Sequence, residues 1–105
     1  MTSEHELRAN ITNLRNHLLA DVGKSNWLEV VVDVSHIEGY IMALRNLNIL
    51  GKKGINKEDY EEAIKLAENV VREARDKDKK ACVNSCLSLS RWLVSRFNIP
   101  PLIDQ

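Results

Sequence analysis

The stretch Trp27-Leu-Glu-Val-Val-Val-Asp-Val34 decides the fold class of this 105-residue chain. Read as a strand, the stretch has apolar residues at alternate positions, Leu28, Val30, Val32 and Val34. Most of them are β-branched, and β-branched residues favour strands. Read as a helix, it begins an apolar stripe at helical spacing: Trp27, Val30, Val31, Val34, Ile37, Ile41 and Leu44. No other stretch reads as a strand, so a strand here would leave its backbone groups unpaired. The pattern therefore predicts a helix over residues 26–50.

Two helices are predicted to flank this segment. Before it, Ser3 and Glu6 form a capping box and Gly23 ends the apolar repeat, which predicts a helix over 3–21. The apolar stripe expected for this first helix is Leu7, Ile11, Leu14 and Leu18. After it, Gly51 ends the helix and Asn56 caps the next one, whose predicted range is 56–75. The apolar stripe expected for this third helix is Tyr60, Ile64, Ala67, Val71 and Ala74.

The segment from Arg75 to Lys80 contains neither glycine nor proline, so it leaves two alternatives open. A single helix over 56–97 would be ~63 Å long at 1.5 Å per residue, which is long for a compact domain of this size. We therefore expect a hairpin at 76–79 and a fourth helix over 78–97, capped by Asp78. The apolar stripe expected for this fourth helix is Cys82, Cys86, Leu89, Leu93 and Phe97. An extended tail follows, because the residue before a proline avoids the α region. The prediction is one all-α domain over 1–105, a small bundle of about four helices.

Composition narrows the function classes. Lys plus Arg and Asp plus Glu number 15 each, so no net field attracts nucleic acid or anionic lipid. No apolar run approaches the ~20 residues that span a bilayer, and the acidic, polar N-terminus is unlike a signal peptide. Cys82 and Cys86 lie one helical turn apart, which is poor geometry for a disulfide. We read them as reduced, buried small residues and expect a cytoplasmic protein of a bacterium or a phage-infected host cell.

One polar cluster stands out within the second helix. Its four residues lie on one helical face: Glu29, Asp33, His36 and Tyr40. The Asp33-x-x-His36 spacing suits a carboxylate and an imidazole that share a metal. Carboxylate-bridged centres in helical bundles need a second such pair on another helix, and none is present. We interpret the cluster as the polar flank of an amphipathic helix and predict no metal, cofactor or catalytic residue.

Two further sets of charged residues on the third helix are candidates for a metal site and a nucleic-acid-binding surface. Its acidic pairs, Glu58 with Glu61 and Glu73 with Asp76, are loosely similar to the magnesium-binding acids of all-α nucleotide pyrophosphatases of the dimeric dUTPase type. The pairs lie about 22 Å apart along one helix, too far to share an ion. A basic stripe is also present, formed by Lys65, Arg72, Arg75 and Lys79. Acidic residues interleave with this stripe, which argues against nucleic-acid binding.

The apolar surface of the second helix predicts a contact between chains. A helix that is apolar nearly all round must be covered nearly all round, and a twofold dimer is the commonest way to do this. We expect a homo-oligomer, most simply a dimer, or an unidentified protein partner. The expected interface residues are Trp27, Leu28, Val31 and Val32, with Ile99, Leu102 and Ile103 of the tail, which has its own bundle as the alternative docking site.

The segment from Trp27 to Leu47, which ends in His36-Ile-Glu-Gly-Tyr-Ile-Met-Ala-Leu-Arg-Asn-Leu47, is similar in style to helical segments of small accessory proteins encoded by bacteriophages. That resemblance implies a structural adaptor or an inhibitor of a host protein, and it carries no functional residue with it. The function predicted is therefore a non-enzymatic protein–protein interaction module. A metal-dependent all-α nucleotide hydrolase is the alternative, and a nucleic-acid-binding protein comes third.

Overall fold

The computed structural model describes residues 3–102, which form four α-helices and no strand. The helices are α1 (Glu4–Gly23), α2 (Trp27–Ile49), α3 (Lys57–Arg75) and α4 (Lys79–Phe97). Each lies within a few residues of its predicted range. The all-α bundle is confirmed, and the β-branched start of α2 is helical because Val30 and Val34 are buried in the helical core and the described residues contain no partner strand.

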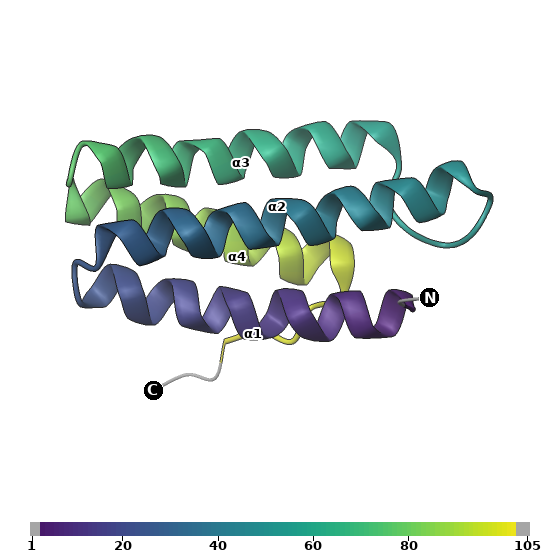
Figure 1. The fold of residues 1–105 in the computed structure, drawn as a ribbon, viewed down its shortest axis with the longest axis horizontal. Helices are drawn as coiled ribbons and strands as arrows, with labels where there is room; N and C mark the ends of the chain where they lie inside the picture. The colour runs from purple at the N-terminus through teal and green to yellow at the C-terminus, as the bar shows by residue number, and fades with distance from the viewer. Residues whose placement is uncertain (1–2, 103–105) are drawn as a thin grey trace.

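Short turns join consecutive helices, so neighbours run antiparallel in a bundle with dimensions of 40 × 27 × 22 Å (Figure 1). The four helices form a ring: α1 lies beside α2 and α4, and α3 also lies beside α2 and α4. The α1–α2 and α3–α4 turns therefore lie at the same end of the bundle (Figure 1). This topology leaves one long face of α2 turned away from the core.

The hairpin between α3 and α4 is confirmed, and the single long helix is wrong. Lys77 adopts a left-handed conformation with φ of 55°, so a non-glycine residue makes the reversal. The Asp78 side chain then accepts a hydrogen bond of 3.1 Å from the Ala81 amide and caps α4. Ser3 and Asn56 cap α1 and α3 in the same way, through the amides of Glu6 and Asp59.

The core follows the predicted stripes in α2 and α4 and departs from them in α1 and α3. In α3 the buried positions are Ala63, Ala67, Val70 and Ala74, so the expected Tyr60, Ile64 and Val71 lie half-buried beside them. Small alanines face the core because they let α3 approach α2 and α4 closely. In α1, Arg15 is buried where Leu14 was expected, and Leu14 is half-buried.

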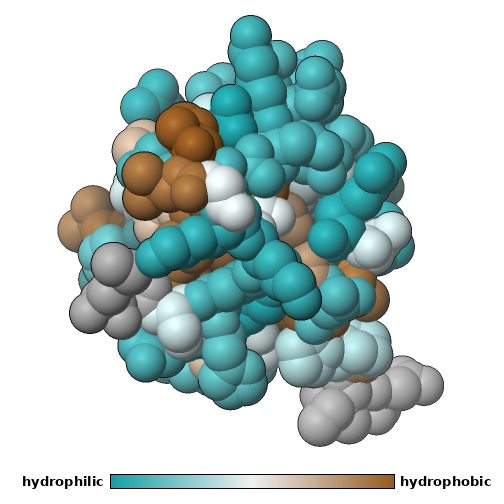
Figure 2. All heavy atoms as spheres, turned by 90° about the vertical axis from the view of Figure 1, so that its right-hand side faces the viewer, coloured by the Kyte–Doolittle hydropathy of each residue, from teal (hydrophilic) through white to brown (hydrophobic). Residues whose placement is uncertain are grey.

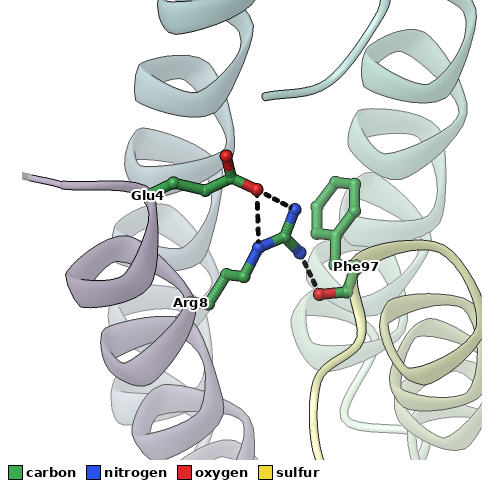
Figure 3. A network of polar contacts seen from close by, with 3 residues as sticks. All are labelled: Glu4, Arg8 and Phe97. Atoms are coloured by element: carbon green, nitrogen blue, oxygen red, sulfur yellow. Dashed lines mark hydrogen bonds and ion pairs between the residues drawn. The ribbon is translucent and has the colours of Figure 1, made fainter. Parts of the chain in front are cut away.

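Arg15 is buried where the C-terminal tail passes over α1, and it binds the tail. Its guanidinium donates hydrogen bonds to the Pro100 carbonyl at 2.7 Å and to the Ser90 hydroxyl at 3.4 Å. Arg8 donates to the carbonyl of Phe97 and to the Glu4 carboxylate, so it ties the end of α4 to the start of α1 (Figure 3). Ile99 is consequently buried against its own bundle, and the tail runs along α1 (Figure 1).

Within residues 3–102, every helix is too short or too polar to cross a bilayer.

Candidate functional site

Large exposed hydrophobic side chains are concentrated on one helix. Of the six in the described chain, five lie on α2 or at its C-terminal end, and the sixth is Leu102 in the tail. The five are Leu28, Val32, Met42, Ile49 and Leu50. Leu28 and Leu50, at opposite ends, are 73% and 70% exposed. Exposed apolar groups that gather in one region of a soluble protein mark a contact surface more often than scattered ones do.

These residues lie on a regular stripe. Apart from Glu29 and His36, the exposed positions of α2 fall at alternating intervals of four and three, which is the spacing of a heptad seam. They are Leu28, Val32, Ser35, Gly39, Met42, Asn46 and Ile49. We call this set the α2 outer stripe. Leu28 to Ile49 spans ~32 Å at 1.5 Å per residue, so the stripe covers almost the whole helix.

The residues at the centre of the stripe have small side chains. Gly39 lies in mid-helix, where glycine costs about 1 kcal/mol relative to alanine. Apart from its two chain neighbours and the adjoining backbone of α2, no atom lies within 4 Å of the position a Cβ would occupy. Ser35, one turn earlier, is also exposed and turns its hydroxyl back to the Val31 carbonyl at 3.0 Å. Packing within this chain therefore gives no reason for a glycine at 39.

A groove borders the centre of the stripe. It has a volume of about 430 Å³ and is lined by α2 residues and one α1 residue, most of them apolar: Leu7, Ser35, His36, Gly39, Tyr40, Ala43 and Leu47. Two of these, Ser35 and Gly39, belong to the stripe itself. The stripe and groove thus form one continuous surface with an apolar hollow at its centre.

Charge is divided along α2. From residue 26 to residue 44 the chain has three acids and no lysine or arginine, and from 45 to 53 it has three bases and no acid. The acids are Glu29, Asp33 and Glu38, and the bases are Arg45, Lys52 and Lys53. The acidic residues of α2 therefore lie in its N-terminal part, and the basic residues lie at and after its C-terminal end.

The end of the molecule where α2 finishes shows the apolar character directly. Hydrophobic side chains form a cluster on a face that is otherwise largely hydrophilic (Figure 2). Ile49 and Leu50 lie at this end of α2, and both are exposed.

The predicted interface residues have different environments. Leu28 and Val32 lie exposed on the stripe, whereas Trp27 and Val31 are half-buried against the core. Ile99 is buried by its own bundle and has no surface to offer a partner, while Leu102 is 40% exposed. Ile103 lies outside the described residues.

The predicted polar cluster is split by the structure. His36 and Tyr40 line the groove, whereas Glu29 and Asp33 point to the other side and meet Asp21 of α1. One carboxylate oxygen from each of Asp21, Glu29 and Asp33 lies within 4.8 Å of the other two. We call these three residues the acidic cluster. Sequence reasoning missed Asp21, although the three-residue turn over 24–26 places the end of α1 beside the start of α2.

Asp33 is the unusual member of the acidic cluster. Its side chain is only 7% exposed, and its Oδ2 has no hydrogen-bond partner in the protein. Burial, a side-chain hydrogen bond with Asp21 and the negative charges of Asp21 and Glu29 together raise the pKa of Asp33 to about 7. The native protein therefore holds a proton at Asp33 that an exposed aspartate would lose near pH 4.

The other weighed residues form no such arrangement. Cys82 and Cys86 are free and buried in the core, and burial raises the pKa of both thiols. On α3, Glu61 pairs with Lys57 and Glu73 with Arg72, each on the helix surface. In the described part of the chain, no cluster of potential metal ligands includes a residue of α3.

No protein-family model, curated protein or solved structure matches this chain.

Proposed function

We propose that this protein is a non-enzymatic interaction module that forms a homodimer through the α2 outer stripe, and that it acts as an adaptor or inhibitor by binding. The observation that carries the proposal is the exposed heptad seam on α2, with apolar residues at both ends and a groove at its centre. A seam of this kind buries its side chains against a second helix in coiled coils and helical bundles.

A second copy of the chain fits the stripe because its exposed leucines meet when one copy is reversed about Gly39. In an antiparallel pair centred there, each residue lies opposite the one equally far on the other side of position 39. Leu28 then faces Leu50, Val32 faces Asn46, and the two Gly39 residues face each other. The positions opposite Ser35, Met42 and Ile49 are each next to a stripe residue in the sequence: Ala43, His36 and Glu29. A twofold dimer requires a self-complementary surface of this kind, and glycine at the crossing point permits close approach of the two backbones.

The charge distribution along α2 favours the same orientation, although Glu29 and Asp33 face Asp21 and lie off the stripe. An antiparallel pair places the acidic start of one α2 beside the basic end of the other, at both ends of the contact. A parallel pair would place acids beside acids and bases beside bases. Exposed charge pairs of this kind contribute little affinity, but they select orientation and register.

Met42 gives the groove an occupant in the same arrangement. Met42 is half exposed in the isolated chain, and it would lie opposite His36 of the second copy. His36 lines the groove. A flexible thioether side chain fills irregular apolar hollows well, so Met42 of each copy would enter the groove of the other.

Sedimentation or light scattering on the purified protein tests the proposal. We expect the mass of a dimer at tens of micromolar, and Val32→Glu or Met42→Glu should shift it to the monomer because each buries a charge in the contact. Asn84→Glu, on the exposed surface of α4, is the matched control and should remain dimeric. A monomeric wild-type protein, or equal effects of all three substitutions, would contradict the proposal.

Oxidative cross-linking tests the antiparallel register. The native thiols are buried, so introduced cysteines dominate the reaction. A mixture of Leu28→Cys and Leu50→Cys chains should give a disulfide-linked heterodimer, whereas each variant alone should give little product, because the two positions face each other. Efficient linkage of Leu28→Cys with itself would indicate a parallel pair.

Gly39→Ala separates folding from association. Apart from the two chain neighbours of residue 39 and the adjoining backbone of α2, the added methyl group meets no atom within 4 Å, so the monomer should gain about 1 kcal/mol from helix propensity. The same methyl group would separate two α2 helices that cross at residue 39 and should weaken the dimer. Chemical denaturation and sedimentation measure the two effects, and a variant that is both more stable and equally dimeric would remove Gly39 from the contact.

A further inference from the structure

We propose that Asp21, Glu29 and Asp33 bind one divalent cation of calcium's size, where the end of α1 meets the start of α2. This site lies on α2 but off the outer stripe, and the proposal does not rest on dimerisation. It gives the chain a ligand-binding site at the end of the bundle that also holds the α3–α4 turn (Figure 1).

The spacing of the three carboxylates fits one ion. Their ligand atoms lie within 4.8 Å of one another, so a single point lies within about 2.8 Å of all three. Calcium binds oxygen at ~2.3–2.6 Å, so adjustments of a few tenths of an ångström bring all three into its first shell. Magnesium requires ~2.0–2.1 Å and a nearly ideal octahedron, which demands a larger contraction of the cluster.

Asp33 supplies the second, separate indication of a ligand. Its carboxylate is more than nine-tenths buried and points into the cluster, and its Oδ2 has no hydrogen-bond partner. A buried polar atom without a partner costs free energy and is uncommon in folded proteins. A cation between the three carboxylates would supply the missing partner.

The surroundings leave the negative charge of the cluster unpaired. Within residues 3–102, no ion pair joins Asp21, Glu29 or Asp33 to a basic side chain. At this end of the bundle, the Lys79 Nζ donates a hydrogen bond to the Gly23 carbonyl at 2.8 Å and so engages that oxygen. The protein would therefore provide three carboxylates, and water would complete the six to eight ligands that calcium takes.

Isothermal titration of chelator-treated protein with CaCl₂ tests the site. We expect one ion per chain, with a dissociation constant below about 1 mM. Glu29→Gln removes an exposed ligand and leaves the fold unaffected, and it should weaken binding at least about tenfold. Glu58→Gln, an exposed acid on α3, is the control and should bind as the wild type does. The Met42→Glu variant, designed to be monomeric, should also bind normally.

A second measurement locates the ion directly. Mn²⁺ broadens NMR signals of nearby nuclei, so substoichiometric Mn²⁺ should first remove the amide signals of residues 21 and 29–33. The proposal is overturned by an absence of heat and of signal changes at about 1 mM Ca²⁺, by equal losses in Glu29→Gln and Glu58→Gln, or by broadening centred elsewhere. Tighter binding of Mg²⁺ than of Ca²⁺ would overturn the assignment to a calcium-sized ion.

Discussion

Arg15 and Asp33 are both ionisable residues that the bundle buries almost completely, at 2% and 7% exposure. They differ in how far their polar atoms find hydrogen-bond partners. The Arg15 guanidinium meets acceptors on Asn16, Ser90 and Pro100, from its own helix, α4 and the tail. The Asp33 carboxylate meets two other carboxylates and keeps one oxygen without a partner. A buried charge with its hydrogen bonds made stabilises a particular fold, whereas one left unsatisfied costs stability and calls for a ligand or a proton.

The largest expected effect is the pH dependence caused by Asp33 in cation-free protein. The native carboxyl keeps its proton up to about pH 7, and the unfolded one loses it near ~3.9. Between these values the native state binds more protons than the unfolded state, so stability falls as the pH rises. The loss is on the order of 3–4 kcal/mol across this window.

Asp33→Asn should remove that pH dependence. Relative to the wild type, it should gain stability at pH 8 and change little at pH 4, as measured by urea denaturation in the presence of a chelator. Lys79 is the basic group that contacts this end of α1, and Asp21 and Glu29 are the acids that face Asp33. If the stability difference between the variant and the wild type is the same at both pH values, Asp33 is ionised in the native state and the comparison with Arg15 fails.

Arg15→Met should give the next largest effect, a loss of about 2 kcal/mol. The methionine keeps most of the apolar stem but donates no hydrogen bond, and bonds from charged donors contribute ~1.5–3 kcal/mol. The tail should loosen at the same time, so the Ile99 amide should exchange with solvent faster than the core amides. Unchanged stability and protection would mean that Ile99 packing alone holds the tail.

Ser90→Ala should have the smallest effect, about 0.5 kcal/mol or less. Its hydroxyl lies 3.4 Å from Arg15, at the long end of hydrogen-bond distances, while the Pro100 contact is 2.7 Å. A double-mutant cycle with Arg15→Met measures the coupling between the two side chains. A coupling above about 1 kcal/mol would make Ser90, and not the tail, the main reason for burying Arg15.

The contrast between these two residues also marks what could be predicted from the sequence. The caps at Ser3, Asn56 and Asp78 were read correctly because capping depends on residues three apart. The predicted stripe of α4 is buried throughout, and that of α2 is buried except for the half-buried Trp27 and Val31, because apolar residues larger than alanine repeat there at helical spacing. The stripe of α3 was partly misread, since its large residues flank the contact and alanines fill it.

The acidic cluster could likewise be predicted only in part from the sequence. Glu29 and Asp33 were singled out, but with His36 and Tyr40, because all four share a stretch of one helix. Helical periodicity orders residues within α2 and does not say which neighbouring helix each one faces. Asp21, on α1, joined the set only when the turn over 24–26 folded α1 back against α2.

The sequence by itself determined the number of helices, their ends, the apolar excess of α2 and the division of charge along it, because these depend on composition and on spacings of a few residues. Only the tertiary structure decided which face of α2 stays uncovered, that the tail folds back onto Arg15, and that three carboxylates meet around a buried, unpartnered oxygen. These outcomes depend on which residues far apart in the chain lie side by side, and helix-to-helix packing sets that pairing.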